Sequence, residues 1–379
     1  MTKVGRSSAF FSVAAAFAGA IGRVIAALVL SAIVSILLIQ GVGGNVPLAL
    51  SSLWDGAFGS PYKLGNTLVA STPLLLTGLG VAIAFRCQMW NIGGEGQFLV
   101  GCLACSALAV NCPLTNKLGL PLLMPIILAA SAAAGAAWAS IAAFLKTWRA
   151  VPEVISTIML NSIAVELLSY LVNGPMERSD HSQPATEMLQ PAATLPYLYQ
   201  LFPKLFAPSP LHVGFIIALV MVGVVYVLIA MTPSGFAMKL VGANMDAARL
   251  SGVAVNRVLI TSMLWSGALC GLAGGVELTG RVGFIPEGYL PGYGYQAIAV
   301  ALLGRLSPIG VLLSALFIGA LSVGCQNMER TAGIAHEMGL MIQAVALLAL
   351  LATQWTGWSN VLPELLRRFS ANNAAIEHQ

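Results

Sequence analysis

Charged residues are scarce in this sequence. Aspartate, glutamate, lysine and arginine make up 8% of the 379 residues, against about 25% in an average soluble domain, while 58% of the residues are hydrophobic. So little polar surface cannot cover a globule in water, which excludes a soluble protein. The net charge of +4 is small and the basic residues are scattered, so we expect no nucleic-acid partner.

Motifs for nucleotide hydrolysis and for common hydrolases are also missing. No glycine directly precedes a lysine, so the pattern G-x-x-x-x-G-K-[ST] does not occur and this chain does not bind ATP in a P-loop. Neither G-x-S-x-G nor H-E-x-x-H is present, which leaves a membrane enzyme without a visible nucleophile or zinc site. We therefore expect no enzymatic activity and no cofactor on this chain, and the energy for any transport must come from a partner or an ion gradient.

Disulfides and metal sites are not indicated. The six cysteines fall almost entirely in apolar runs, and the four histidines lie at or outside the ends of these runs. Cys102 and Cys105 have C-x-x-C spacing but no further ligands nearby, so we interpret them as helix-packing residues.

Apolar runs long enough to cross a bilayer recur along the chain. A span needs about 20 mainly apolar residues. The segments that qualify are 24–42, 67–85, 122–145, 154–172, 212–231, 259–279, 307–326 and 337–355. Two shorter runs, 98–112 and 292–304, follow glycine-rich stretches and suit broken or re-entrant helices. The sequence predicts an all-α polytopic membrane protein with about ten transmembrane helices, in a single domain over residues 1–379.

The basic residues predict the orientation of the chain. With the N-terminus inside and ten crossings, most lysines and arginines fall on the cytoplasmic side, as the positive-inside rule requires. The N-terminal segment 1–23, the loop 232–258 and the tail 356–379 are then cytoplasmic. The loop 173–211 is extracytoplasmic, and either caps the pore, meets an extracytoplasmic partner, or is a solvated connector. We expect a bacterial cytoplasmic (inner) membrane location with lipid around the bundle.

Two blocks of the chain suggest internal symmetry. Residues 67–172 and 259–355 each hold four predicted crossings, which run in opposite senses, and each block contains one glycine-interrupted short helix. This arrangement predicts two inverted, broken-helix repeats with a substrate path at their interface.

Polar residues in apolar surroundings are candidates for the path. Asn91, Glu95 and Gln97 surround three glycines, and such a segment must face protein or water because bare backbone groups in hydrocarbon are costly. They either bind a polar solute or cap the break. Asn161 and Glu166 are five residues apart, about 140° around a helix. We expect Glu166 to face the bundle interior, as a path residue or a partnered structural carboxylate.

Two further segments have a structural interpretation. Gly267, Gly271 and Gly275 lie on one face of a helix, which predicts a close-packing seam. In the internal loop, helix-forming residues over 244–250 followed by Gly252 predict a short helix along the cytoplasmic face.

Four motifs in order resemble a known family. They are Asn91 to Gln97 (NIGGEGQ), Glu153 to Asn161 (EVISTIMLN), the segment 242–252 with Gly242-Ala243-Asn244, and Gly294-Tyr295 followed by 297–304 (AIAVALLG). Together they resemble the membrane subunits of bacterial ABC importers for nucleosides and simple sugars, which are related to the ribose and branched-chain amino acid permeases. The resemblance covers roughly residues 65–350, and the longer of two paired permeases is most similar.

The resemblance implies partners and roles. It implies two ATPase subunits that hold the ATP, a second permease that is a paralogue, and an extracytoplasmic substrate-binding protein or lipoprotein. The loop 242–257 would be the coupling helix that docks in the ATPase. The residues assigned to coupling are Gly242, Asn244, Ala247, Ala248, Arg249, Gly252 and Arg257, and those assigned to the path are Asn91, Glu95, Gln97, Asn161 and Glu166.

Three functions compete. An ABC permease explains the four motifs, the missing P-loop and the internal loop helix. An ion-coupled secondary transporter with Glu95 or Glu166 as its proton or sodium site would also have broken helices and inverted repeats. A membrane enzyme is the third alternative, and it has no visible catalytic group.

Overall fold

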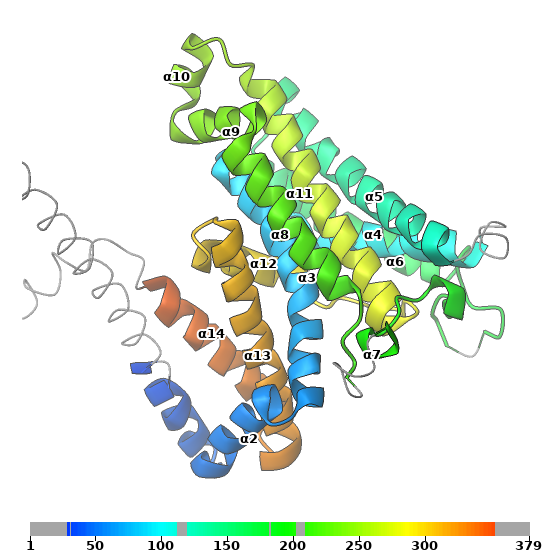
Figure 1. Cartoon of the computed structure of the whole chain (residues 1–379), viewed down its shortest axis with the longest axis vertical. Helices are drawn as coiled ribbons and strands as arrows, with labels where there is room; N and C mark the ends of the chain where they lie inside the picture. Colours follow the sequence, from blue (N-terminus) through cyan, green and yellow to red (C-terminus); the bar gives the residue numbers. More distant parts are fainter. Residues whose placement is uncertain (1–28, 31, 112–119, 182, 202–208, 353–379) are drawn as a thin grey trace, which may run out of the picture. The chain divides into compact units, whose positions relative to one another are not determined.

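The described chain is almost entirely helical (Figure 1). A computed structural model describes residues 29–30, 32–111, 120–181, 183–201 and 209–352, so the predicted terminal segments 1–23 and 356–379 lie outside the described residues. The helices are α2 (Val46–Phe58), α3 (Pro61–Arg86), α4 (Gly94–Asn111), α5 (Leu120–Arg149), α6 (Glu153–Val172), α7 (Leu198–Leu201), α8 (Gly214–Met231), α9 (Pro233–Ala243), α10 (Met245–Leu250), α11 (Val255–Glu277), α12 (Tyr293–Leu303), α13 (Pro308–Ala332) and α14 (His336–Ala352). A further helix, Ala32–Gly41, precedes them.

Six helices are long and apolar enough to cross a membrane. They are α3, α5, α6, α8, α13, and α11 together with the π-helical turn Leu278–Val282 that extends it. The chain is therefore an all-helical, multi-pass membrane protein. The two segments that the sequence predicts to be short are the short helices α4 and α12, while Ala32–Gly41 and α14 occupy the described parts of two further predicted spans. The count of ten crossings stays a prediction.

The chain divides into two compact units. Of the described residues, those within 29–52 and 328–352 form one, and those within 53–327 form the other. In the first unit, Gly44 in the turn before α2 lies against Ile334 before α14. The second unit contains all the residues that the sequence assigns to a site.

Helix α11 is the centre of the second unit, where it packs against α3, α4 and α5. Its contact with α5 is formed by residues without bulky side chains. A Cβ atom on Gly267 would overlap Gly135 of α5, and one on Gly271 would overlap the Ser131 carbonyl. Gly275 lies against the Ser131 side chain. The three glycines therefore let two long helices approach at backbone distance, as small residues do in membrane bundles.

Helix α8 presents a different surface. Its exposed side chains are hydrophobic, apart from the phenol of Tyr226: Ile216, Leu219, Val220, Val224, Tyr226, Val227, Ala230 and Met231. A helix of 18 residues with this surface is suited to contact lipid. It begins at Gly214, two residues later than the apolar run in the sequence.

Three helices are not predicted from the sequence, namely the single turn α7 and the longer α2 and α9. The amphipathic α2 has 13 residues, and α9 has 11. Both have clear start signals, since the Asn45 side chain accepts the Leu48 N–H (3.1 Å) and the Thr232 hydroxyl accepts the Gly235 N–H (3.1 Å). They are too short to be found in a search for membrane spans, which need about 20 mainly apolar residues.

The described part of the segment 173–211 packs on one end of the helices rather than extending into solvent. In its described part, Ala185 pairs with Pro286 and the Leu195 N–H bonds to the Thr279 carbonyl (2.8 Å). Leu198 is buried there as well. The segment and the loop after α11 therefore form one cap over this end of the unit.

Candidate functional site

A non-helical break separates α3 from α4. α3 ends at Arg86, and in the break Gln88 has a φ of 58°, a conformation that side chains rarely adopt. Two side chains fix its start to distant elements. Arg86 Nε donates to the Leu306 carbonyl (2.8 Å), and Gln88 Nε2 donates to the Gly242 carbonyl at the end of α9 (2.9 Å). The break is thereby connected to α9 and to the turn after α12.

Asn91 organises the inside of the break. Its Nδ2 donates to Gln97 Oε1 (2.9 Å) and to Ser266 Oγ of α11 (2.8 Å). Its Oδ1 accepts the Gly93 N–H (3.0 Å) and Gln97 Nε2 (3.0 Å). Asn91 and Gln97 are 0% and 1% exposed. The two amides therefore form a reciprocal, buried pair that satisfies the backbone where the helix stops.

Glu95 connects the starts of the two short helices. It lies in the first turn of α4, and its two carboxylate oxygens accept the Gly292 N–H (2.8 Å) and the Gly294 N–H (2.6 Å) at the start of α12. Gly294 approaches the α4 backbone so closely that a Cβ atom there would overlap Glu95. Helix N-termini carry free N–H groups and a positive dipole end, so one buried carboxylate complements both termini.

Asn161 of α6 holds the same region from the side. Its Oδ1 accepts the Gly96 N–H (2.8 Å), and its Nδ2 donates to the Ile92 carbonyl (2.9 Å) and lies 3.4 Å from the Tyr295 hydroxyl. The asparagine is 2% exposed. It therefore bonds to groups on both sides of the break and also reaches α12.

Four of the five residues that the sequence assigns to the path meet around the first turn of α4. They are Asn91, Glu95, Gln97 and Asn161. Their hydrogen-bonding groups are used within the chain, so in this conformation they hold the break together. Glu166 does not join them. The expectation that it faces the interior of the chain's own bundle is wrong, because the side chain is exposed on the opposite side of α6.

The internal loop forms a helical hairpin of α9 and α10 at the opposite end from the cap (Figure 1). Asn244 starts α10 by accepting the Asp246 N–H (2.9 Å) and the Ala247 N–H (3.0 Å). Gly252 follows α10 with a φ of +82°, which suits glycine.

The residues assigned to coupling differ in exposure. Asn244, Ala247, Arg249, Gly252 and Arg257 are exposed, whereas Gly242 is half-buried and Ala248 is buried. Leu250, at the end of α10, is 91% exposed. The tip of the hairpin thus presents an apolar side chain beside charged ones, outside the bundle.

A second buried polar cluster lies where α11 ends, and the sequence analysis missed it. Arg281 Nη1 donates to Glu277 Oε1 (2.9 Å) and contacts the Tyr293 hydroxyl (2.7 Å), which in turn donates to Glu277 Oε1 (3.2 Å). Glu277 is 1% exposed. The spacing of four residues between Glu277 and Arg281 is the local signal, but Tyr293 comes from another helix.

The end of α11 is continuous with the cap. His212, before α8, packs its ring against Gly280 in the π-helical turn. Its Nδ1 accepts the Gly214 N–H (3.1 Å), while its Nε2 has no hydrogen-bond partner among the described residues. Burial, and to a smaller extent the charge of the nearby Arg281, lower the pKa of His212 to about 4. The ring is therefore neutral at pH 7.

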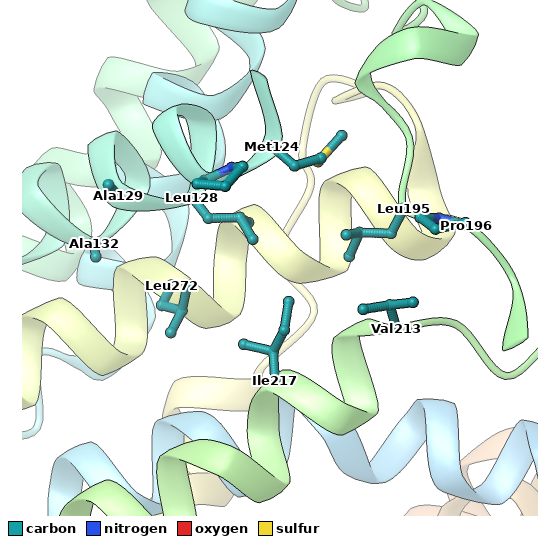
Figure 2. A pocket seen from close by; sticks show the side chains of 10 residues that line it. Met124, Leu128, Ala129, Ala132, Leu195, Pro196, Val213, Ile217 and Leu272 are labelled. Carbon is teal, nitrogen blue, oxygen red and sulfur yellow. The ribbon is translucent and has the colours of Figure 1, made fainter. Parts of the chain in front are cut away.

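An open cavity of about 600 Å³ lies between α5, α8 and α11. Figure 2 shows Leu128, Ile217 and Leu195 around it. Every lining residue is apolar: Met124, Pro125, Leu128, Ala129, Ala132, Leu195, Pro196, Val213, Ile217 and Leu272. A cavity without a polar side chain offers nothing that would orient a hydroxylated solute, so we assign it no role in the path.

The sequence matches one family over most of its length. Residues 63–351 match the family described as "Branched-chain amino acid transport system / permease component". No solved structure matches.

Characterised relatives align over nearly the same region. The chain is 35% identical to the glucose ABC transporter permease protein TsgB13 of Haloferax volcanii, over 85% of this chain and 87% of the relative. It is 38% identical to the guanosine ABC transporter permease protein NupP of Bacillus subtilis, over 81% and 86%. A second guanosine permease of that organism, NupQ, is 29% identical over 67% and 78%.

Proposed function

Because the chain belongs to the permease components of branched-chain amino acid-type ABC transport systems, we propose that it forms the translocation path of an importer for a nucleoside or a simple sugar. As a permease component it is a transport subunit rather than an enzyme. The glucose and guanosine permeases among its relatives support the substrate class.

The hairpin of α9 and α10 is the observation that carries the proposal. An apolar Leu250 that is 91% exposed suits a contact that another protein covers. Beside it, Arg249 pairs with Asp246 (3.1 Å) at the surface. In the proposed importer α10 is the coupling helix, and it docks into a groove of a separate ATPase subunit that binds and hydrolyses ATP.

The contacts of α9 supply a route from this helix to the break. Gly242, at the end of α9, packs so closely on the end of α3 that a Cβ atom would overlap the Arg86 carbonyl. Its own carbonyl accepts the Gln88 side chain (2.9 Å), three residues before Asn91. A displacement of the hairpin is thereby passed to the segment that joins α3 to α4.

Alternating access follows from this connection. When the ATPases close, the hairpin moves and the break, held by Asn91, Glu95, Gln97 and Asn161, changes its packing against α12. The contact between the starts of α4 and α12 through Glu95 supports a hinge between the two proposed repeats. Transport needs no covalent chemistry in this chain.

The proposed assembly has several further members. NupP and NupQ of one organism both resemble this chain, which supports a second permease that is a paralogue. We expect an extracytoplasmic substrate-binding protein or lipoprotein on the side of the cap. The importer lies in the bacterial cytoplasmic membrane, with both termini of this chain in the cytoplasm.

An ion-coupled transporter is the weaker alternative. At Glu95, one of its two candidate ion sites, both carboxylate oxygens accept backbone N–H groups, so this alternative would depend on Glu166. The ABC permeases among the relatives do not favour it either.

Co-purification tests the proposal. The tagged chain is purified from native membranes in mild detergent, the proteins that accompany it are identified, and ATP hydrolysis is assayed. We expect an ATPase with a P-loop and a second permease. A chain that purifies alone, without ATPase activity, contradicts the importer.

Variants at the hairpin test the coupling role. Leu250→Asp, and deletion of 244–252, should abolish co-purification of the ATPase and uptake while leaving membrane insertion intact. Met188→Asp is the matched control for co-purification of the ATPase, because Met188 is also exposed (63%) but lies in the cap segment. Normal ATPase binding by Leu250→Asp and by the deletion would show that α10 is not the coupling helix.

A further inference from the structure

One side of α6 is exposed along its whole length. The exposed residues are Ile155, Ile158, Met159, Ser162, Ile163, Glu166, Tyr170 and Asn173, the residue that follows the helix. At 100° per residue they fall within an arc of about 140°, so they form a single face, which we call the α6 face. It carries a hydroxyl and a carboxylate in a helix of membrane-spanning length.

The α6 face is unlike the exposed face of α8. Val220, Val224 and their exposed neighbours on α8 offer no charge, and lipid is a suitable contact for them. Glu166 has no hydrogen-bond or ion-pair partner among the described residues, and a bare carboxylate against hydrocarbon is strongly disfavoured. The α6 face must therefore contact water or another protein in the membrane.

The polar character of the α6 face continues beyond Glu166. Asn173 Nδ2 donates to Glu287 Oε1 of the loop after α11 (3.0 Å), and Ser169 Oγ lies 3.5 Å from the same oxygen. From Ser162 to Asn173 the helix rises about 17 Å. Along this distance the face offers acceptor oxygens and no basic side chain, which is the lining that hydroxyl groups of a solute require.

We propose that the α6 face is the wetted wall of the translocation path and that Glu166 determines its specificity. The carboxylate accepts hydrogen bonds from the hydroxyls of an uncharged solute and repels anionic solutes such as phosphorylated sugars. A single solvated carboxylate binds a hydroxyl weakly, as release from a transport path demands. This inference rests on the proposed importer function. It adds that Glu166 selects uncharged solutes over anionic ones.

Thiol reactivity tests whether the face is wet. Ser162→Cys is made in the full chain and examined in native membranes with all partners, with and without ATP and vanadate. A membrane-impermeant cationic methanethiosulfonate should modify it. Val220→Cys on α8 is the matched control in lipid and should stay unmodified, as should the parent chain, whose described cysteines are all buried.

The charge of the reagent tests the role of Glu166. The side chains of Ser162 and Glu166 are four residues apart, about 5–6 Å on a helix. The ratio of cationic to anionic modification rates at the Ser162→Cys thiol should therefore fall about tenfold when Glu166→Gln is added. Asp246→Asn, which removes a carboxylate on α10, is the control and should leave the ratio unchanged.

The outcomes separate this inference from the function it rests on. If the ATPase co-purifies and uptake is normal but Ser162→Cys is unreactive in both nucleotide states, a protein partner covers the α6 face and the inference is wrong. An unchanged rate ratio with Glu166→Gln overturns the charge selection alone. If neither uptake nor an ATPase is found, the importer itself is wrong.

Discussion

Asn161 and Glu166 lie on the same helix, α6, and face opposite sides of it. The amide of Asn161 is 2% exposed and bonds to the break between α3 and α4, whereas the carboxylate of Glu166 is exposed on the other side. The hydrogen-bonding groups of Asn161 are thus used within the chain. The carboxylate oxygens of Glu166 are free to accept hydrogen bonds. Stability and solute selection are therefore expected to depend on different residues of this helix.

The side chain of Asn161 should contribute to the stability of the folded chain. Asn161→Leu leaves the Gly96 N–H and the Ile92 carbonyl buried without a partner, at a cost of about 1–3 kcal/mol each. We expect a clear drop in the thermal unfolding temperature of the detergent-purified chain. Glu166→Gln, the matched control on the same helix, should unfold like the parent chain, and equal losses in both variants would refute the distinction.

The carboxylate between the two short helices should be hard to replace. In Glu95→Gln the new side-chain NH₂ must face either the Gly292 N–H or the Gly294 N–H, so one donor loses its acceptor. This costs about 1–3 kcal/mol and loosens the contact between α4 and α12.

Uptake and unfolding together test this expectation. Glu95→Gln should unfold earlier and transport more slowly, with the ATPase still bound. Glu287→Gln changes a nearby exposed carboxylate and should keep parent-like stability. A Glu95→Gln chain that is as stable as the parent would show that the two backbone donors do not need the carboxylate.

The contact between α11 and α5 should not tolerate even one added methyl group. Alanine favours a helix over glycine by about 1 kcal/mol, so Gly223→Ala on α8, where no atom lies within 4 Å of the new Cβ, should be neutral or stabilising. Gly271→Ala should have the opposite sign, because its Cβ overlaps the Ser131 carbonyl. Thermal unfolding and the yield of folded chain measure both, and a stabilised Gly271→Ala would contradict the close approach.

Local signals in the sequence identify much of this fold. The apolar runs correspond to helices, the glycine-rich stretches before 98–112 and 292–304 coincide with helix starts, and Asn244 and Gly252 bound α10. Each of these depends on residues close together in the chain, such as a cap or a missing side chain.

Contacts between helices that are far apart in the sequence could not be predicted from it. The helical period separates Asn161 from Glu166 by about 140°, but only the packing of α4 on α6 decides which of the two faces inward. Glu277 is buried because Tyr293 and Arg281 surround it, and Tyr293 comes from another helix. Similarly, the close contact of Gly242 with the end of α3 joins segments that are more than 150 residues apart in the chain.

Acid should destabilise the cap through His212. This residue lies in the connection before α8, and its pKa is lowered to about 4 in the folded chain, against about 6.5 when unfolded. Between these values the unfolded chain binds more protons, so the free energy of unfolding decreases as the pH falls, by at most about 3 kcal/mol. Above pH 7 the ring is neutral in both states and contributes no slope.

Two histidine variants isolate this effect. His212→Phe keeps a planar ring beside Gly280 and removes the titrating group, so unfolding between pH 7 and pH 4.5 should lose part of its acid sensitivity. His181→Gln is the control. His181 is exposed and its pKa is raised by a hydrogen bond with Glu177, so its contribution is present at low pH and is lost as the pH rises. Removing it should not reduce acid sensitivity, and equal reductions in the two variants would refute the role of His212.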